Sequence, residues 1–107
     1  MLTTDHINDG YDNPMWCGVG YLGCREQLTE TTRHTADKVV LKHANARGWT
    51  PEVFFEWLNS KCGRWFCDHT YGRRWTQRDL YNATGSLFDD IESWMPATTL
   101  ATMNKEN

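Results

Sequence analysis

Residues 49–75 read WTPEVFFEWLNSKCGRWFCDHTYGRRW, and this segment decides the fold. It holds eight of the 14 aromatic residues of the chain, interleaved with Lys61, Arg64, Arg73 and Arg74. Large rings are costly to expose to water, so the segment either builds most of the hydrophobic core or presents an adhesive face to another molecule. The sequence leaves both alternatives open, and the choice between them is the central functional question.

The bulk composition predicts a single domain covering residues 1–107. A chain of this length buries a core without disulfides or a metal, and six tryptophans suit either a small core or a binding hot spot. No run of about 18 apolar residues occurs, and the N-terminus lacks the basic start and apolar stretch of a signal peptide. We therefore expect a cytoplasmic protein with no membrane partner.

Apolar spacing predicts an all-α fold with three main helices over about residues 28–47, 50–70 and 76–95. Turn-forming residues and glycines before residue 25 predict an irregular, glycine-rich N-terminal arm laid across the helices. Residues 1–13 and 97–107 are polar and poor in anchors, which predicts flexible ends.

Local signals mark the helix ends. Gly48 follows the last periodic residue of the first helix, as a left-handed cap does. Thr50 before Pro51 predicts an N-cap followed by proline at the first helical position. Gly63 is expected to weaken or bend the second helix. Thr76 predicts the cap of the third helix, which Pro96 should end.

Charge is unevenly distributed along a chain whose net charge is −3. Residues 1–30 carry −4, residues 31–78 carry +5, and the remainder carries −4. A basic centre favours a phosphate backbone, whereas acidic flanks oppose it. A nucleic-acid-binding, helix-turn-helix-like protein is therefore the alternative function, using the basic 61–78 region: Lys61, Arg64, Arg73, Arg74 and Arg78.

The turn at residues 44–50 echoes a helix-turn-helix, because a glycine joins two predicted helices. The helix that would then read DNA carries Glu52 and Glu56 among apolar residues. Base readout needs Arg, Lys, Asn or Gln, so we do not expect this helix to enter a groove.

Four cysteines, Cys17, Cys24, Cys62 and Cys67, could hold zinc, form two disulfides or remain free thiols. Their intervening gaps of six and four residues are at or beyond the usual zinc-pair spacing. On one continuous helix Cys62 and Cys67 would point roughly 140° apart and could not share an ion. Free buried thiols are favoured, and we expect no metal and no cofactor.

Two short motifs suggest enzymatic chemistry without supporting it. Residues 18–23 spell the dinucleotide fingerprint GVGYLG, but no apolar strand precedes them. Cys67 stands two positions from His69, yet neighbouring side chains point apart on a helix or strand. We therefore expect a protein that is not an enzyme.

The number of rings favours an interaction surface. Phe54 and Phe55 are successive and point about 100° apart on a helix, so one helix face cannot bury both. We predict that Phe55, Trp57 and Trp65, with Arg64, anchor a partner, which is the composition of an interface hot spot. Homo-oligomerisation is a further use that the sequence leaves open.

Residues 48–61 (GWTPEVFFEWLNSK) and 63–66 (GRWF) resemble small accessory proteins encoded by bacteriophages of actinobacteria. The resemblance covers under half of the chain and carries over no site residue. It implies an accessory protein made inside a bacterial host cell, where such small products often bind and modulate a host protein.

Overall fold

A computed structural model describes residues 1–13, 20–72 and 74–89, and these residues are mostly helical with no strand among them. The helices of this part are α1 (Thr4–Asp12), α2 (Tyr21–Arg25), α3 (Glu30–Ala46), α4 (Pro51–Leu58), α5 (Lys61–Thr70), α6 (Gln77–Thr84) and α7 (Ser86–Asp89). The predicted all-α class is confirmed for the described residues.

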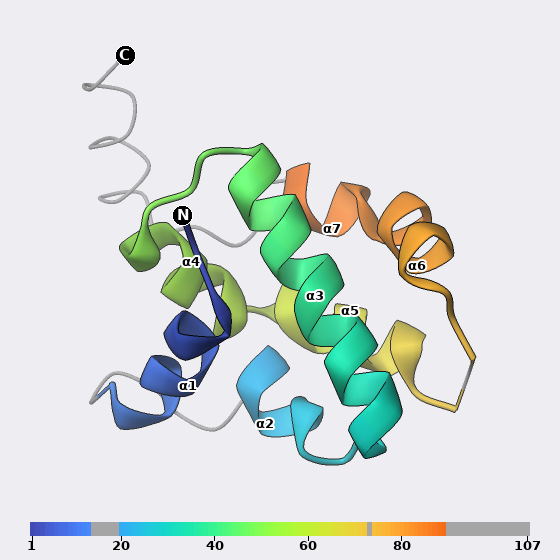
Figure 1. The fold of residues 1–107 in the computed structure, drawn as a ribbon. Helices are drawn as coiled ribbons and strands as arrows, with labels where there is room; N and C mark the ends of the chain where they lie inside the picture. The colour runs from blue at the N-terminus through green and yellow to red at the C-terminus, as the bar shows by residue number, and fades with distance from the viewer. Residues whose placement is uncertain (14–19, 73, 90–107) are drawn as a thin grey trace.

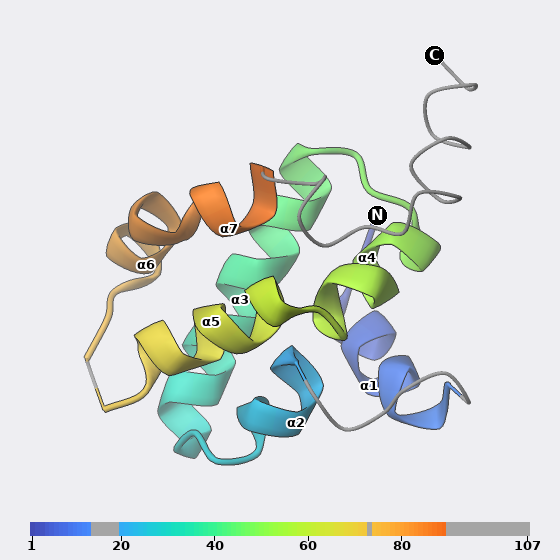
Figure 2. The ribbon, with the colours of Figure 1, turned by 180° about the vertical axis from the view of Figure 1, so that it is seen from behind.

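The helices wrap around one aromatic centre. In Figure 1, α3 crosses the front of the molecule, α6 and α7 follow one another along its side, and α1 and α2 lie at its lower end. Seen from behind, α5 lies in front, between α2 and the α6–α7 pair (Figure 2). The outer faces of α3 and α5 therefore look in opposite directions.

The predicted caps are confirmed where the local sequence carries them. Gly48 ends α3 with a φ of 67°, a left-handed conformation that L side chains rarely adopt. The hydroxyl of Thr50 accepts a hydrogen bond from the backbone N–H of Val53 at the start of α4. Thr76 accepts one from Asp79 in the same way at the start of α6.

The three-helix count is not confirmed, because two of the predicted helices are divided. The predicted 50–70 helix breaks at Asn59 and Ser60 into α4 and α5. Ser60 caps α5 by accepting from Gly63 N–H, and its hydroxyl donates to the Trp57 carbonyl at 2.7 Å. The predicted 76–95 helix divides at Gly85, and its end from residue 90 onward lies outside the described residues, as do residues 97–107.

The predicted irregular N-terminal arm is also corrected. Residues Thr4–Asp12 form α1, and Tyr21–Arg25 form the short α2. Leu2 and Ile7, in the segment expected to be flexible, are buried. The backbone N–H of Leu2 donates to Asn45 Oδ1 of α3 at 2.8 Å, which ties the start of the chain to the core. Residues 14–19 of the predicted arm lie outside the described residues.

Gly63 lies inside α5 and does not break it. A Cβ at this position would stand 2.7 Å from the Trp57 carbonyl oxygen and 3.0 Å from the Tyr21 backbone nitrogen. The residue therefore allows α5 to approach α2 and the end of α4 more closely than any side chain would permit.

The core is a cluster of rings centred on Trp57. Its indole stacks on Phe88 at 4.3 Å between centroids and contacts Phe66 edge-on at 5.8 Å. Tyr21 tilts against both Trp57 and Phe66. All four rings are fully buried and come from α2, α4, α5 and α7, so this cluster holds four helices together.

None of the described helices combines the length and the apolar character needed to cross a membrane.

Candidate functional site

The aromatic segment divides into core and surface. Trp49, Phe54, Trp57 and Phe66 are all buried, whereas Trp65 is 53% and Tyr71 is 63% exposed. The prediction that Trp57 anchors a partner is wrong, because its side chain is fully buried and its indole N–H donates to the Leu87 carbonyl at 2.9 Å. Among the described residues, Trp65 and Tyr71 are therefore the aromatic side chains that remain exposed.

Trp65 lies on the outer surface of α5, which we call the α5 face and define by Lys61, Arg64, Trp65 and Asp68. All four are exposed, while Cys62, Phe66 and Cys67 on the same helix are buried. Residues three and four apart on a helix are surface neighbours, so Lys61 and Asp68 flank the indole along the helix axis. The α5 face is one aromatic ring bordered by charges of both signs.

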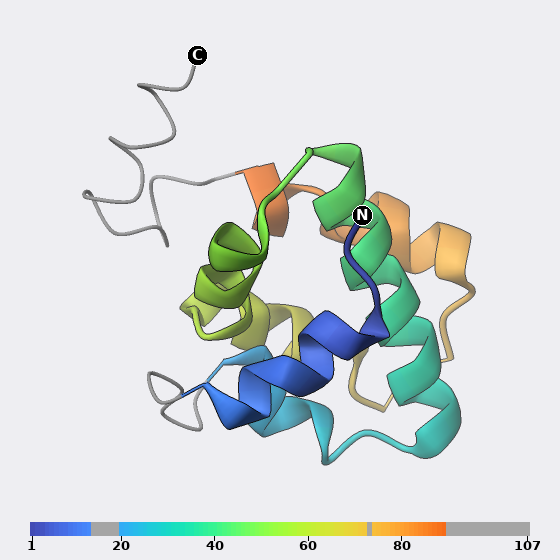
Figure 3. The same cartoon turned by 60° about the vertical axis from the view of Figure 1, so that its left-hand side comes forward.

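Phe55 does not join this face. It is half-buried and lines a pocket of about 370 Å³ between α1 and α4, together with Asp9, Glu52 and Glu56. Figure 3 shows these two helices side by side. The ring predicted to stand beside arginines is therefore surrounded by carboxylates. Of the four predicted anchors, the structure brings together only Arg64 and Trp65.

The basic residues of the alternative prediction are also separated. Lys61 and Arg64 lie on α5, whereas Arg74 precedes α6 and Arg78 lies in its first turn. Arg73 lies outside the described residues. Lys61 and Arg64 therefore lie on a different helix from Arg78, with a turn between the two helices.

Lys38 and Lys42 lie on α3, which packs against α6, the helix that carries Arg78. The ammonium nitrogen of Lys42 lies 4.9 Å from the centroid of the Tyr81 ring of α6, so the two helices meet at this point. Lys38 is one turn before Lys42, so the two lysines share one flank of α3. Arg78 is three residues before Tyr81, so it shares the flank of that ring on α6. We call Lys38, Lys42, Arg74 and Arg78 the α3–α6 ridge. Sequence reasoning missed both lysines, because nothing local indicated that α3 packs against α6.

A pocket of about 700 Å³ opens at one end of this ridge. It lies between the start of α3 and the turn from α5 to α6, and its polar and aromatic lining comes from Thr31, Thr32, Thr35, Tyr71, Arg74 and Trp75. We call it the threonine pocket. No carboxylate of the described residues lines it. The repeated threonines at 29, 31, 32 and 35 were a visible signal in the sequence, but their meeting with Tyr71 depends on the fold.

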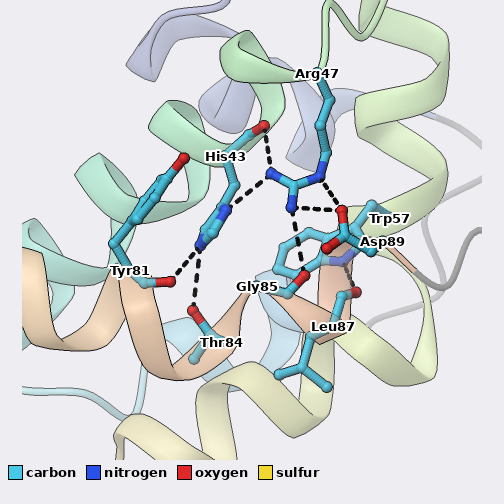
Figure 4. Close-up of polar contacts among 8 residues, drawn as sticks. All are labelled: His43, Arg47, Trp57, Tyr81, Thr84, Gly85, Leu87 and Asp89. Atoms are coloured by element: carbon cyan, nitrogen blue, oxygen red, sulfur yellow. Dashed lines mark hydrogen bonds and ion pairs between the residues drawn. The ribbon is translucent and has the colours of Figure 1, made fainter.

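Among the described residues, His43 is a histidine with a lowered pKa, and its neighbours have structural roles (Figure 4). Its ring stacks between Tyr81 at 3.9 Å and Phe88 at 4.2 Å. The Arg47 guanidinium lies 2.9 Å from Nδ1, and because arginine can only donate, the proton of the imidazole resides on Nε2. Nε2 then donates to the Tyr81 carbonyl at 2.9 Å. Both nitrogens are engaged, so this ring joins α3 to α6 and is not poised as a general base.

His43 should make the protein sensitive to acid. Burial, and then the positive charge of Arg47, lower the pKa of His43 from 6.5 to about 4. Between these values the unfolded chain binds a proton that the folded chain excludes, so the free energy of unfolding falls as pH drops from 6.5 to 4. Above pH 6.5 this group has no effect. At about 1.4 kcal/mol per pH unit, the loss reaches on the order of 3 kcal/mol.

Urea unfolding followed by circular dichroism at several pH values between 7 and 4 measures this loss. In His43→Gln the acid-dependent loss should shrink, whereas His34→Gln, which removes an exposed histidine of the same helix, should retain it. An unchanged acid slope in His43→Gln would contradict the assignment to His43.

The cysteines are not assembled as a four-thiolate zinc site in the described residues. Cys62 and Cys67 lie on the single continuous helix α5, so they diverge as the spacing indicated. Burial, with Cys24 nearby, raises the pKa of Cys67 from 9.0 to about 12, which keeps this thiol protonated at neutral pH. No disulfide joins Cys24, Cys62 and Cys67 to one another, no metal-binding group of three appears among the described residues, and Cys17 lies outside them.

The described residues of the remaining motifs have structural surroundings. A Cβ at Gly20 would stand 2.7 Å from the Leu58 carbonyl oxygen, so this glycine of the dinucleotide motif packs against α4 and leaves no room there for a pyrophosphate. Cys67 is buried whereas His69 is exposed and stacks on Trp75 at 5.2 Å. α4 directs Glu52 toward solvent and carries no cation to read bases.

Comparison with protein-family models, with curated proteins and with solved structures found no match for this chain.

Proposed function

We propose that this chain is a small non-catalytic binding protein that recognises a protein partner through the α5 face. The observation that carries the proposal is the exposure of Trp65, at 53%, in a chain that buries Trp49 and Trp57 almost completely. Tryptophan and arginine are the residues most enriched among interface hot spots, and Trp65 follows Arg64 directly. An indole with a charged border is the usual centre and rim of such an interface.

The resemblance of residues 48–66 to accessory proteins of actinobacterial bacteriophages supports a host protein as the partner. An accessory protein of this kind acts by stoichiometric binding in the cytoplasm of a bacterial cell, where it modulates the protein that it contacts. The proposed anchors are therefore Trp65 and Arg64, fewer than the sequence predicted, and Lys61 and Asp68 form the rim.

Affinity capture from a lysate of an actinobacterial host tests the proposal when it is run on matched variants. Trp65→Ala should weaken capture of the specific partner by roughly 30-fold or more, the usual scale of a hot-spot residue. Tyr71→Ala removes a ring of similar exposure from outside the α5 face and should leave capture unchanged. A partner retained equally by Trp65→Ala and by the parent chain would refute the assignment of the α5 face.

A further inference from the structure

The α3–α6 ridge groups four positive charges that no described carboxylate pairs with. Among the described residues the salt bridges join Arg25 to Asp37 and Arg47 to Asp89, so none of the four ridge cations is paired with a carboxylate. Asp79 is exposed on α6, but it is one position from Arg78 and two from Tyr81, spacings that do not face each other on a helix. Asp79 therefore does not share the flank of Arg78 and Tyr81 on its own helix.

The ridge leads directly into the threonine pocket. Arg74 belongs to both, and Thr35 stands three residues before Lys38 on α3. From Thr35 to Lys42 the helix axis advances roughly 10 Å, at about 1.5 Å per residue. This distance lets one extended ligand occupy the pocket and contact the cations at the same time.

The lining of the pocket favours a planar group with polar edges. Tyr71, 63% exposed, offers a ring surface, and Trp75, whose ring also stacks on His69, lines the same pocket. Threonine hydroxyls both donate and accept hydrogen bonds. Nucleobases combine a π face with donors and acceptors along their edges, and proteins bind unpaired bases by stacking them on aromatic side chains. An acidic peptide or a lipid headgroup supplies the negative charge without such a plane.

We propose that the α3–α6 ridge and the threonine pocket bind single-stranded nucleic acid, with the backbone along the ridge and one unstacked base in the pocket. Duplex DNA would satisfy the ridge but leave the pocket empty, because its bases are stacked inside the helix. Threonine hydroxyls can both donate and accept hydrogen bonds, so they discriminate weakly among bases. Binding should therefore depend little on the base sequence. This surface differs from the α5 face in both residues and orientation.

Fluorescence anisotropy of a labelled single-stranded oligonucleotide of mixed sequence, titrated with the full chain, tests the proposal. Four phosphate contacts predict a fall in affinity of roughly 50-fold between 50 and 200 mM salt. Lys38→Glu combined with Lys42→Glu should abolish binding at the higher salt. Tyr71→Ala should lower affinity about tenfold by removing a stacking surface.

A charge-matched double variant and a duplex probe test whether binding depends on the ridge and on a single strand. Lys61→Glu combined with Arg64→Glu makes the same charge change on the α5 face and should lower affinity far less than the ridge variant. Equal losses in the two double variants, or equal affinity for a duplex of the same sequence, would overturn the proposal. So would ridge-dependent binding to phosphatidylserine vesicles without binding to the oligonucleotide.

A failure of nucleic-acid binding is distinguishable from a failure of the proposed protein binding. Trp65→Ala should retain oligonucleotide binding and lose the protein partner, whereas Tyr71→Ala should do the reverse. All exposed-site variants are first compared with the parent chain by thermal unfolding, so that a loss of binding is attributed only to chains that fold.

Discussion

Replacement of Trp57 with alanine is expected to destabilise the folded chain by about 3–5 kcal/mol, the range found for large buried aromatic residues. The side chain is fully buried and its ring contacts Tyr21, Phe66 and Phe88, which belong to three other helices. Its removal leaves a cavity that these neighbours cannot fill without moving their helices. A domain of this size is stable by only about 5–15 kcal/mol, so the variant should be near or beyond its folding limit.

Urea unfolding followed by far-ultraviolet circular dichroism measures the effect, since that signal does not depend on the tryptophan that is removed. Trp65→Ala is the matched control, because the same substitution at a half-exposed site should change stability by less than about 1 kcal/mol. Trp57→Phe should lie between them, because it keeps an aromatic ring but loses the indole bond to the Leu87 carbonyl. A midpoint for Trp57→Ala equal to that of Trp65→Ala would contradict the described core.

Features of the fold that depend on neighbouring residues were predictable from the sequence. Thr50 before Pro51, and Thr76 three residues before Asp79, form their caps with groups at most three positions away. Gly48 supplies a positive φ that its position after the periodic run indicated. In each case the chemistry that decides the conformation lies within one turn of the helix.

Features that depend on distant partners were not predictable. The break at Ser60 was hidden because the apolar residues continue with helical spacing across it. α2 holds only five residues and packs closely against α5 at Gly63, so its stability comes from tertiary contact and not from propensity. The burial of Trp57 rather than Trp65 required knowing where α7 places Phe88, 31 positions later in the chain.

The candidate surfaces show the same limit. Sequence reasoning placed Trp65 and Arg64 together correctly because they are adjacent in the chain. It grouped Lys61 with Arg78 because both fall in one basic stretch, whereas the fold places Lys42 of α3 4.9 Å from the ring of Tyr81, three residues after Arg78 on α6. Phe55 lines the same pocket as Asp9 of α1, a helix that the sequence did not indicate.

The fold separates acidic from basic residues, so a chain with a net charge of −3 can still carry a basic surface. The pocket between α1 and α4 gathers Asp9, Glu52 and Glu56, while the four cations of the ridge lie along α3 and α6. Such an arrangement orients the molecule in the field of a charged partner, so a chain that is acidic overall can still present its basic side.

The second large effect is expected at Asp37, whose side chain lies in a buried network joining α2 to α3. Its carboxylate accepts from Arg25 Nη2 at 2.7 Å, Arg25 Nε at 2.8 Å and the Tyr21 hydroxyl at 2.6 Å. Burial and then the Asp37 charge raise the pKa of Tyr21 well above its ordinary value of 10.0, so the phenol remains a donor. Arg25 is held further by the hydroxyl of Tyr11, at 3.1 Å.

Asp37→Ala should cost about 3–5 kcal/mol, because it leaves a largely buried guanidinium and a buried phenol without their acceptor. The expected loss comes mainly from those stranded partners and much less from the pair's own net contribution. Arg25→Met combined with Asp37→Leu should therefore be less destabilised than Asp37→Ala alone, since both charges leave together. Urea unfolding of Arg25→Met, of Asp37→Leu and of the double variant gives the coupling energy between the two side chains. If Asp37→Ala cost less than about 1 kcal/mol, water would have to reach Arg25 in the folded chain, and α2 could not be docked on α3 as the carboxylate requires.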